Sequence, residues 1–383
     1  MTSKIRNPRT LGPFVTTLAA CALLVFVFLG GAKTLRAQSP SGTWAMTSSD
    51  RPGYVELSLT ISRLGHHMQE DSDWSLSSFQ GLDTSNAARH DVKFSVTRDA
   101  GRLECDGFLE NGEGAGVFHF FADAKYPQQM SALGFDGIDA EKQFSMAIHD
   151  VSVAFAKEMK DEHVSGLDTD KLIAFRIFGV DKQFIDDLRS SGINVTDSDK
   201  LVAFRIHGVT PEFVRSLHQA GYTPDEDTLI ALRIHGATPE WIAQMSQAGY
   251  PHADLEKLIA FRIHGVSPDF VAQLNHFGYA HLDPDELIAF RIHDVSPDFV
   301  AQLDHFGYAH LDPDQLVTFR IHGVSPEFVA ALDKLGYHHP DPDQLVDMRI
   351  HGVTPEYISD LRSRGMQNLS IDQLVNMRIH GID

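Results

Sequence analysis

The sequence predicts an α+β multidomain protein, in which a small antiparallel β sandwich or barrel-like module is followed by an all-α solenoid of helix-turn-helix repeats. Two patterns in the chain of 383 residues lead to this prediction. Between residues 38 and 124 apolar and polar residues alternate with a period of two, as in strands with one buried face. Between residues 125 and 383 one helical motif returns about every 29 residues, which is typical of stacked repeats.

Residues 1–37 have the composition of an export signal. Lys4, Arg6 and Arg9 precede an almost unbroken apolar stretch over residues 13–32. These 20 residues are more than most cleaved signal peptides contain in their apolar core, and enough to cross a bilayer. A cleaved signal peptide and a retained membrane anchor therefore both stay open. We expect an exported protein of bacterial type that is periplasmic, secreted, or anchored in the cytoplasmic membrane by residues 13–32.

The β module, residues 38–124, predicts about six antiparallel strands. Apolar side chains alternate over residues 54–61, 92–96 and 103–109, and a shorter segment with this pattern lies at each end of the module. The pair Asn111-Gly112 favours a tight hairpin turn because both residues tolerate positive φ. Strands of this number and length are typical of a small sandwich or a partly open barrel.

Trp44 and Trp74 of this module have two possible roles. They could line the mouth of a ligand cavity, since aromatic residues are common there. An aromatic side chain in a strand of a small β module more often belongs to the hydrophobic core, and we favour that interpretation.

An arginine in each unit makes the repeat of residues 125–383 visible. Consecutive arginines are 29 residues apart, with a single step of 28. This arginine ladder consists of Arg176, Arg205, Arg233, Arg262, Arg291, Arg320, Arg349 and Arg378. Counting a degenerate first unit, the array holds about eight units.

Each unit carries the start and stop signals of two short helices. In the clearest copy Ser325-Pro326 begins the first helix and Gly336 ends it, while Asp341-Pro342 and Gly352 do the same for the second. Helices of about ten residues are marginal in water, so the units must stack to be stable.

Two irregularities fit this scheme. The 28-residue step falls between Gly221 and Leu229, in the turn between helices, where a deletion is tolerated. Asp294 replaces a helix-ending glycine, and Asp adopts the left-handed conformation at modest cost.

Composition and motifs favour a binding protein over an enzyme. The net charge of −20 opposes contact with nucleic acid and with anionic lipid. The sequence has no nucleophile elbow, zinc-peptidase motif or phosphate-binding loop, and we expect neither catalytic residues nor a cofactor. Repeated units make extended surfaces, whereas an active site needs groups that occur once.

A histidine recurs two residues after most ladder arginines and is the candidate metal ligand of the array. The series is His207, His235, His264, His293, His322, His351 and His380. Each histidine falls at the end of a helix, where an imidazole interacts favourably with the last carbonyls. Because equivalent histidines are about 10 Å apart in stacked units, we favour this structural role over metal binding.

The ladder arginines need partners, because stacked like charges repel. An acidic residue follows the proline that starts the next helix, and these residues are Glu212, Glu240, Asp269, Asp298, Glu327 and Glu356. We expect arginine–carboxylate pairs that join one unit to the next. An arginine-lined groove for anionic ligands is the alternative.

Loop residues between the two helices form a further recurring set. It contains His276, His281, His305, His310, His338 and His339 with Tyr279, Tyr308 and Tyr337. The loops on one edge of a solenoid often bind partners. We favour solvated loops without a binding role.

The repeated run LIAFRIHGVSPDFV of residues 258–271 and the run GAGVFHF of residues 114–120 resemble a group of uncharacterised bacterial exported proteins. In this group a β module precedes helical repeats with the motif RIHGV(S/T)PEFV. Similar repeats follow membrane domains of antirepressor metallopeptidases of the BlaR type. The resemblance covers roughly residues 40–383 and implies extracytoplasmic sensing or protein interaction. The zinc-peptidase motif is absent from this chain, so that activity does not carry over.

These observations predict a non-catalytic extracytoplasmic scaffold that binds protein or peptide partners along the array, with a role in envelope sensing. Two alternatives remain. The run at residues 321–329 faintly resembles a helix-hairpin-helix motif of nucleic-acid-binding proteins, although export and acidity speak against it. A hydrolase acting through the β module is the other.

Overall fold

The computed structural model describes residues 40–63 and 66–382. The predicted export signal or anchor, residues 1–37 with the apolar stretch 13–32, lies outside the described residues. Within the described ranges, no helix combines the length and the apolar composition needed to span a membrane.

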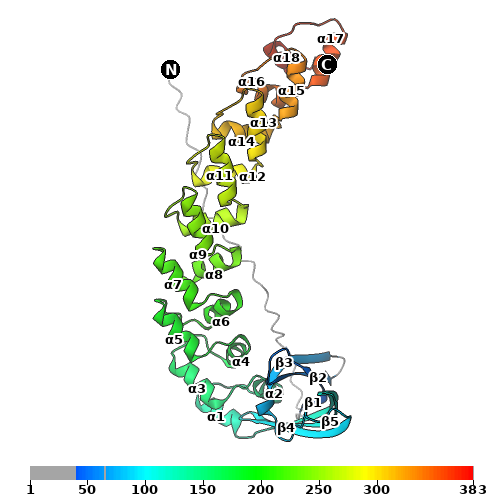
Figure 1. The fold of residues 1–383 in the computed structure, drawn as a ribbon, viewed down its shortest axis with the longest axis vertical. Helices are drawn as coiled ribbons and strands as arrows, with labels where there is room; N and C mark the ends of the chain where they lie inside the picture. The colour runs from blue at the N-terminus through cyan, green and yellow to red at the C-terminus, as the bar shows by residue number, and fades with distance from the viewer. Residues whose placement is uncertain (1–39, 64–65, 383) are drawn as a thin grey trace. The chain divides into compact units, whose positions relative to one another are not determined.

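The β module is one six-stranded antiparallel sheet with the strand order β3-β2-β1-β6-β5-β4 (Figure 1). Its strands are β1 Ser41–Ser48, β2 Tyr54–Arg63, β3 His66–Ser75, β4 His90–Arg98, β5 Gly101–Glu110 and β6 Glu113–Ala122. A 3-10 turn, η1 at Leu76–Ser78, follows β3.

The sheet curves so that side chains of its two edge strands meet. The guanidinium of Arg98 on β4 lies 4.3 Å from the ring centroid of Trp74 on β3. After η1, Gln80 forms a β-bridge with Ser95 on the free side of β4. The module is therefore barrel-like, and the expected alternative of two stacked sheets is not formed.

Trp44 lies at the centre of the module's core, as the favoured interpretation expected. Its side chain is buried, its Nε1 donates a hydrogen bond to the carbonyl oxygen of Asp106 at 3.2 Å, and its ring meets Phe94 edge-on. Gly107 and Gly116 leave room for the indole, because a Cβ at either would approach it to 2.6 or 2.7 Å. Trp74 is also buried.

The predicted turn at Asn111-Gly112 is confirmed. These residues have φ values of 53° and 82°, and they connect Glu110 and Glu113, which pair directly across β5 and β6. Two consecutive positive φ values match the twist of a two-residue hairpin.

Eighteen helices follow within the described residues and pair into nine hairpins, one more than the eight or so expected (Figure 1). They are α1 Tyr126–Ala132, α2 Ala140–Ile148, α3 Val153–Asp161, α4 Thr169–Phe178, α5 Lys182–Ser190, α6 Ser198–His207, α7 Pro211–Gln219, α8 Glu226–His235, α9 Pro239–Gln247, α10 Leu255–His264, α11 Pro268–His276, α12 Pro284–Ile292, α13 Pro297–His305, α14 Pro313–His322, α15 Pro326–Lys334, α16 Pro342–Ile350, α17 Pro355–Ser363 and α18 Ile371–Ile379. From α4 onward each even-numbered helix packs on the next even-numbered one, so that these helices form one layer.

The helix ends follow the predicted capping rules. Ser325 Oγ accepts a hydrogen bond from the backbone N–H of Phe328 at 3.2 Å, and Pro326 occupies the first turn of α15. Gly336, with φ 84°, ends that helix in the left-handed conformation. Asp294 takes the same conformation with φ 59°, as expected for a residue that replaces glycine.

The position of the missing residue is also confirmed. The loop between α7 and α8 spans residues 220–225, whereas the equivalent loop between α9 and α10 spans residues 248–254. The deletion therefore shortens a loop and leaves both helices intact.

The first helical hairpin shares its core with the sheet. Phe144 of α2 stacks on Phe118 of β6 with 5.8 Å between ring centroids, and it meets Phe120 edge-on. The buried side chain of Gln143 donates hydrogen bonds to the carbonyl oxygens of Ala100 and Asp123. The predicted boundary at residue 124 thus separates strands from helices, while the described strands and helices belong to one compact unit.

We predict that Phe319→Ala in α14 lowers the free energy of unfolding by about 3–5 kcal/mol, because this ring is fully buried. Urea denaturation followed by circular dichroism measures the change. Ile321→Ala, two residues along the same helix, is the matched control and costs less than about 0.5 kcal/mol, since Ile321 is 56% exposed. Equal losses for the two variants would mean that the stacked core is assigned to the wrong helix face.

Candidate functional site

Most ladder arginines bind the end of the preceding even-numbered helix. Arg291 of α12 donates a hydrogen bond through Nε to the carbonyl oxygen of His264, the last residue of α10, at 3.3 Å. Its guanidinium lies 4.9 Å from the ring centroid of Phe270, in the helix that connects the two. One side chain therefore holds three successive helices together.

The same two contacts recur along the array. The Nε donors and histidine carbonyl acceptors are Arg176–His149, Arg233–His207, Arg262–His235, Arg291–His264, Arg320–His293 and Arg349–His322. The arginine–ring contacts are Arg176–Phe155, Arg205–Phe184, Arg233–Phe213, Arg262–Trp241, Arg291–Phe270, Arg320–Phe299, Arg349–Phe328 and Arg378–Tyr357.

The glycine after the histidine belongs to this contact. Gly265 has φ 73°, and a Cβ at this position would lie 2.9 Å from Nη2 of Arg291. Glycine here allows both the left-handed helix end and the close approach of the next arginine. The recurring Arg-Ile-His-Gly motif is thus explained mainly by stacking.

The structure does not confirm the predicted carboxylate partners of the arginine ladder. Among the described residues no ion pair joins the ladder arginines from Arg176 to Arg349 to Glu212, Glu240, Asp269, Asp298, Glu327 or Glu356. The four glutamates of this set accept hydrogen bonds at the start of their own helices. The pKa of Glu240 lies below its ordinary value because its own backbone N–H and the Thr238 side chain donate to it, with a smaller contribution from the charge of Arg233.

Two ladder arginines do bind carboxylates, at a position that the sequence analysis missed. Arg176 pairs with Asp150 at 2.8 Å and Arg320 pairs with Asp294. Both aspartates replace the helix-ending glycine and have positive φ. In most other repeats the arginine lies over a glycine at this position, and in these two repeats it binds the aspartate carboxylate.

The ladder histidines do not gather into a metal site. The described residues contain no group of three or more histidine, cysteine, aspartate or glutamate side chains arranged to hold an ion. The carbonyl groups of five of them, His207, His235, His264, His293 and His322, accept the arginine hydrogen bonds. The sequence analysis expected the imidazoles to bind the last carbonyls of the helices, but here an arginine of the next even-numbered helix binds the carbonyl of the histidine.

A second set of inter-repeat contacts, missed by the sequence analysis, joins the starts of even-numbered helices. The ion pairs are Lys142–Asp170, Lys171–Asp199, Lys200–Asp227 and Lys257–Asp285. The lysines could have been found, because they recur in the first turn of the second helix. From α12 onward Glu286, Gln315, Gln344 and Gln373 take this position and close capping boxes within their own helices.

The loop tyrosines are structural as well. Tyr279 Oη donates a hydrogen bond to the carbonyl oxygen of Leu311 in the next loop at 2.8 Å, and Tyr308 donates to Pro340 at 2.7 Å. Burial raises the pKa of both phenols to about 12. The ring of His339 stacks on Tyr308, with its Nε2 3.0 Å from the carbonyl oxygen of Gly307. Tyr279, Tyr308 and His339 therefore pack against neighbouring loops and do not extend freely into solvent.

One apolar surface remains unpartnered, and it runs along the layer of even-numbered helices. The isoleucine after each ladder arginine is between 40% and 56% exposed. We call this set the isoleucine row, and it consists of Ile177, Ile206, Ile234, Ile263, Ile292, Ile321, Ile350 and Ile379. Three residues earlier, on the same helix face, lies an alanine in the helices from α4 to α12.

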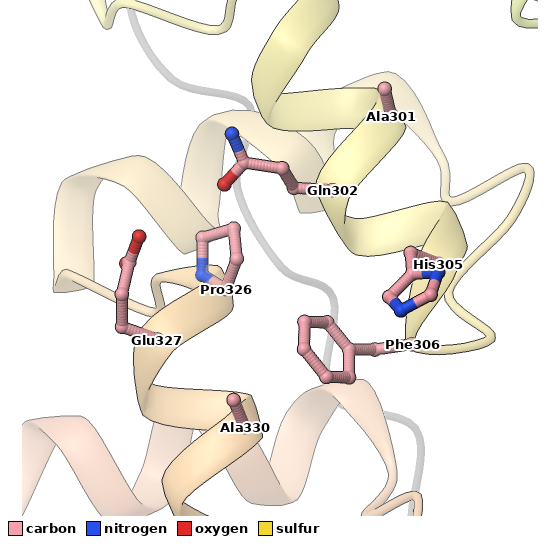
Figure 2. Close-up of a pocket in the computed structure, with 7 residues that line it drawn as sticks. All are labelled: Ala301, Gln302, His305, Phe306, Pro326, Glu327 and Ala330. Carbon is pink, nitrogen blue, oxygen red and sulfur yellow. The ribbon is translucent and has the colours of Figure 1, made fainter.

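A shallow hollow lies on the other layer, between α13 and α15 (Figure 2). Its volume is about 350 Å³. Its lining is mainly apolar, and Figure 2 shows the ring of Phe306 between the two helices, with His305 above it and Glu327 on the facing helix. The hollow is local to this hairpin pair, whereas the isoleucine row extends over eight helices.

One cavity inside the β module is too small to hold a ligand. A cavity lined by Trp74, Arg98, Phe120 and their neighbours has a volume of about 10 Å³, whereas ligand pockets usually measure about 300–1,000 Å³. The thiol of Cys105 is buried there, and burial raises its pKa to about 12. The two tryptophans therefore belong to the core.

Charged side chains meet where the sheet contacts the first hairpin. His149, at the end of α2, is 15% exposed and lies 3.8 Å from Glu70 of β3. Arg98 of β4 donates to the carbonyl oxygen of Ala147, and Arg176 of α4 binds Asp150. Burial, then the charges of Arg98 and Arg176, lower the pKa of His149 to about 4. Burial raises the pKa of Glu70.

No family model matches the chain, and a search of curated proteins finds no relative.

We predict that Arg291→Lys destabilises the array by about 1–2 kcal/mol, because lysine cannot keep both the Nε hydrogen bond and the ring contact. Thermal unfolding in low and high salt measures the effect. Asp298→Asn removes the partner that the sequence suggested and should change stability by less than about 0.5 kcal/mol. A larger loss for Asp298→Asn would restore the ion-pair interpretation.

We predict that His149 makes the protein less stable in acid. Its pKa in the folded state, about 4, lies below the ordinary 6.5, so the folded state binds a proton less readily than the unfolded state. The contribution is complete above pH 6.5 and is lost as the pH falls toward 4, by about 2 kcal/mol at pH 5. Protonation of Glu70 acts in the opposite sense.

Comparison with His149→Gln isolates the His149 contribution, because Glu70 is common to both proteins. The free energy of unfolding of the native protein relative to the variant should fall between pH 7 and pH 5. A difference that does not change with pH would show that His149 titrates normally.

Proposed function

We propose that this chain is a non-catalytic extracytoplasmic scaffold whose repeat array binds a protein or peptide partner, with a role in envelope sensing. The isoleucine row supports this proposal most directly. Eight large apolar side chains, each about half exposed, lie at equivalent positions of eight packed helices. A single exposed isoleucine is ordinary, but an ordered series of them resembles the apolar part of an interaction surface.

The other recurring residues support the same conclusion by elimination. The ladder arginines, the loop tyrosines and the first-turn lysines bind neighbouring repeats, so their recurrence is explained by stacking. The isoleucines make no such polar contact, and each of their side chains is about half exposed. A repeated residue that costs solubility and does not fill the core is best explained by a partner.

Location is part of the proposal. The basic and apolar residues before residue 38 favour export, and the sequence resemblance to bacterial exported proteins with a β module and such repeats favours an extracytoplasmic role. A soluble form and a form anchored by residues 13–32 would both present the array outside the cytoplasm.

We expect that replacing three neighbouring isoleucines, Ile292→Ser, Ile321→Ser and Ile350→Ser, abolishes capture of the partner in proximity labelling of intact cells. The full-length chain carries the labelling enzyme, and membrane and soluble fractions are compared. Folding should be preserved because all three side chains are more than half exposed.

Ala330→Arg, which fills the hollow between α13 and α15, is the matched control and should leave capture unchanged. If the triple variant labels the same proteins as the native chain, or only random envelope proteins are recovered with either, the isoleucine row is not the binding surface.

A further inference from the structure

We propose that the isoleucine row binds an extended, basic polypeptide segment in the polyproline II conformation, with an apolar side chain at every third residue. This inference rests on the proposed function and specifies the partner's chemistry.

The spacing of the row selects the conformation of the partner. Packed helices lie about 8–10 Å apart, so a segment that crosses the layer meets one isoleucine at about this interval. A polyproline II segment returns to the same face after three residues of ~3.1 Å each, or about 9 Å. A β-strand returns after about 6.7 Å and would lose register within two helices.

Small residues beside the row leave space for the partner's apolar side chains. In α6 the exposed isoleucine Ile206 is preceded on the same face by Ala203, and in α10 Ile263 is preceded by Ala260. The alanine side chains are partly exposed and shorter than isoleucine, so each isoleucine extends further from the helix surface than the alanine beside it. An apolar side chain of the partner fits over the alanine and against the isoleucine.

Carboxylates border the same helix face one further turn toward the helix start. In α14, α16 and α18 they are Asp314, Asp343 and Asp372, seven residues before the isoleucine, and all three are exposed. Unlike Asp170 or Asp199, these three have no lysine or arginine within ion-pair distance in the described ranges. Asp347 of α16 adds a carboxylate where earlier helices have alanine.

The charge of the partner follows from this border. Unpaired carboxylates in a chain of net charge −20 attract lysine and arginine and repel acidic segments. The N-terminal part of the row is more apolar, because of its alanines, and the C-terminal part is more acidic. A segment that is apolar toward one end and basic toward the other is complementary to both parts.

The test measures binding of labelled synthetic peptides to the purified full-length chain by fluorescence anisotropy. One peptide of about 18 residues repeats Leu-Pro-Lys, so that leucine recurs with the polyproline II period. A second has the same composition with the leucines out of period, and a third has glutamate in place of lysine. The first should bind about tenfold more tightly than either of the others.

Two variants locate the binding. Ile292→Ser with Ile321→Ser and Ile350→Ser should remove binding of the first peptide. Asp314→Asn with Asp343→Asn and Asp372→Asn should weaken it about tenfold and reduce its dependence on salt. Ala330→Arg should leave it unchanged.

Equal binding of the in-period and out-of-period peptides, no binding of any peptide, or binding that survives the triple isoleucine variant would overturn the inference. If the triple isoleucine variant still loses its partner in cells, the proposed function stands and only the chemistry of the partner is refuted. If capture in cells is also unaffected, both fail.

Discussion

Burial of one hydrophobic face between successive hairpins is the constraint on which the rest of this protein depends. Each helix has only two turns or so of regular structure, and helices of this length are marginal in isolation. Phe261, Phe290 and Phe319, at equivalent positions of three even-numbered helices, are fully buried by neighbours on both sides. The polar contacts between repeats then decide the register in which this burial occurs. The arginine ladder is the most regular of them, because most of its arginines reach the end of the previous even-numbered helix and all of them lie over an aromatic ring.

Because the hairpins are stable only when stacked, most recurring residues of the repeat motif serve to hold the repeats together. The arginine, the glycine, the turn tyrosine and the capping serine or aspartate each have a partner in the same or the next repeat. The isoleucine between arginine and histidine is the recurring large residue whose side chain remains largely outside the interior. Function in a repeat protein is best sought among recurring residues that stacking does not use.

The parts of the fold that could be predicted from sequence depend on local rules. Capping residues, the left-handed Asp294 and the shortened loop after Gly221 are each determined within a few residues of the chain. The arginine partners could not be predicted in this way, because Arg291 reaches a carbonyl group 27 residues away, and every residue has a carbonyl. The isoleucine row was missed for a different reason: residues 258–263 are apolar at five of six positions, so periodicity alone does not show which side chain is exposed.

The shared core of α2 and the sheet gives the array a defined beginning. Phe144 and Gln143 complete the β module with side chains that come from the first repeat. During synthesis the strands leave the ribosome before any helix, and domains near the N-terminus fold first. The module with α2 is then a template on which α4 can dock, and each later hairpin docks on the one before it. The array would then grow from its N-terminal end toward its C-terminal end. A solenoid usually needs a capping unit at its first repeat to stay soluble. In this chain a β module takes that place.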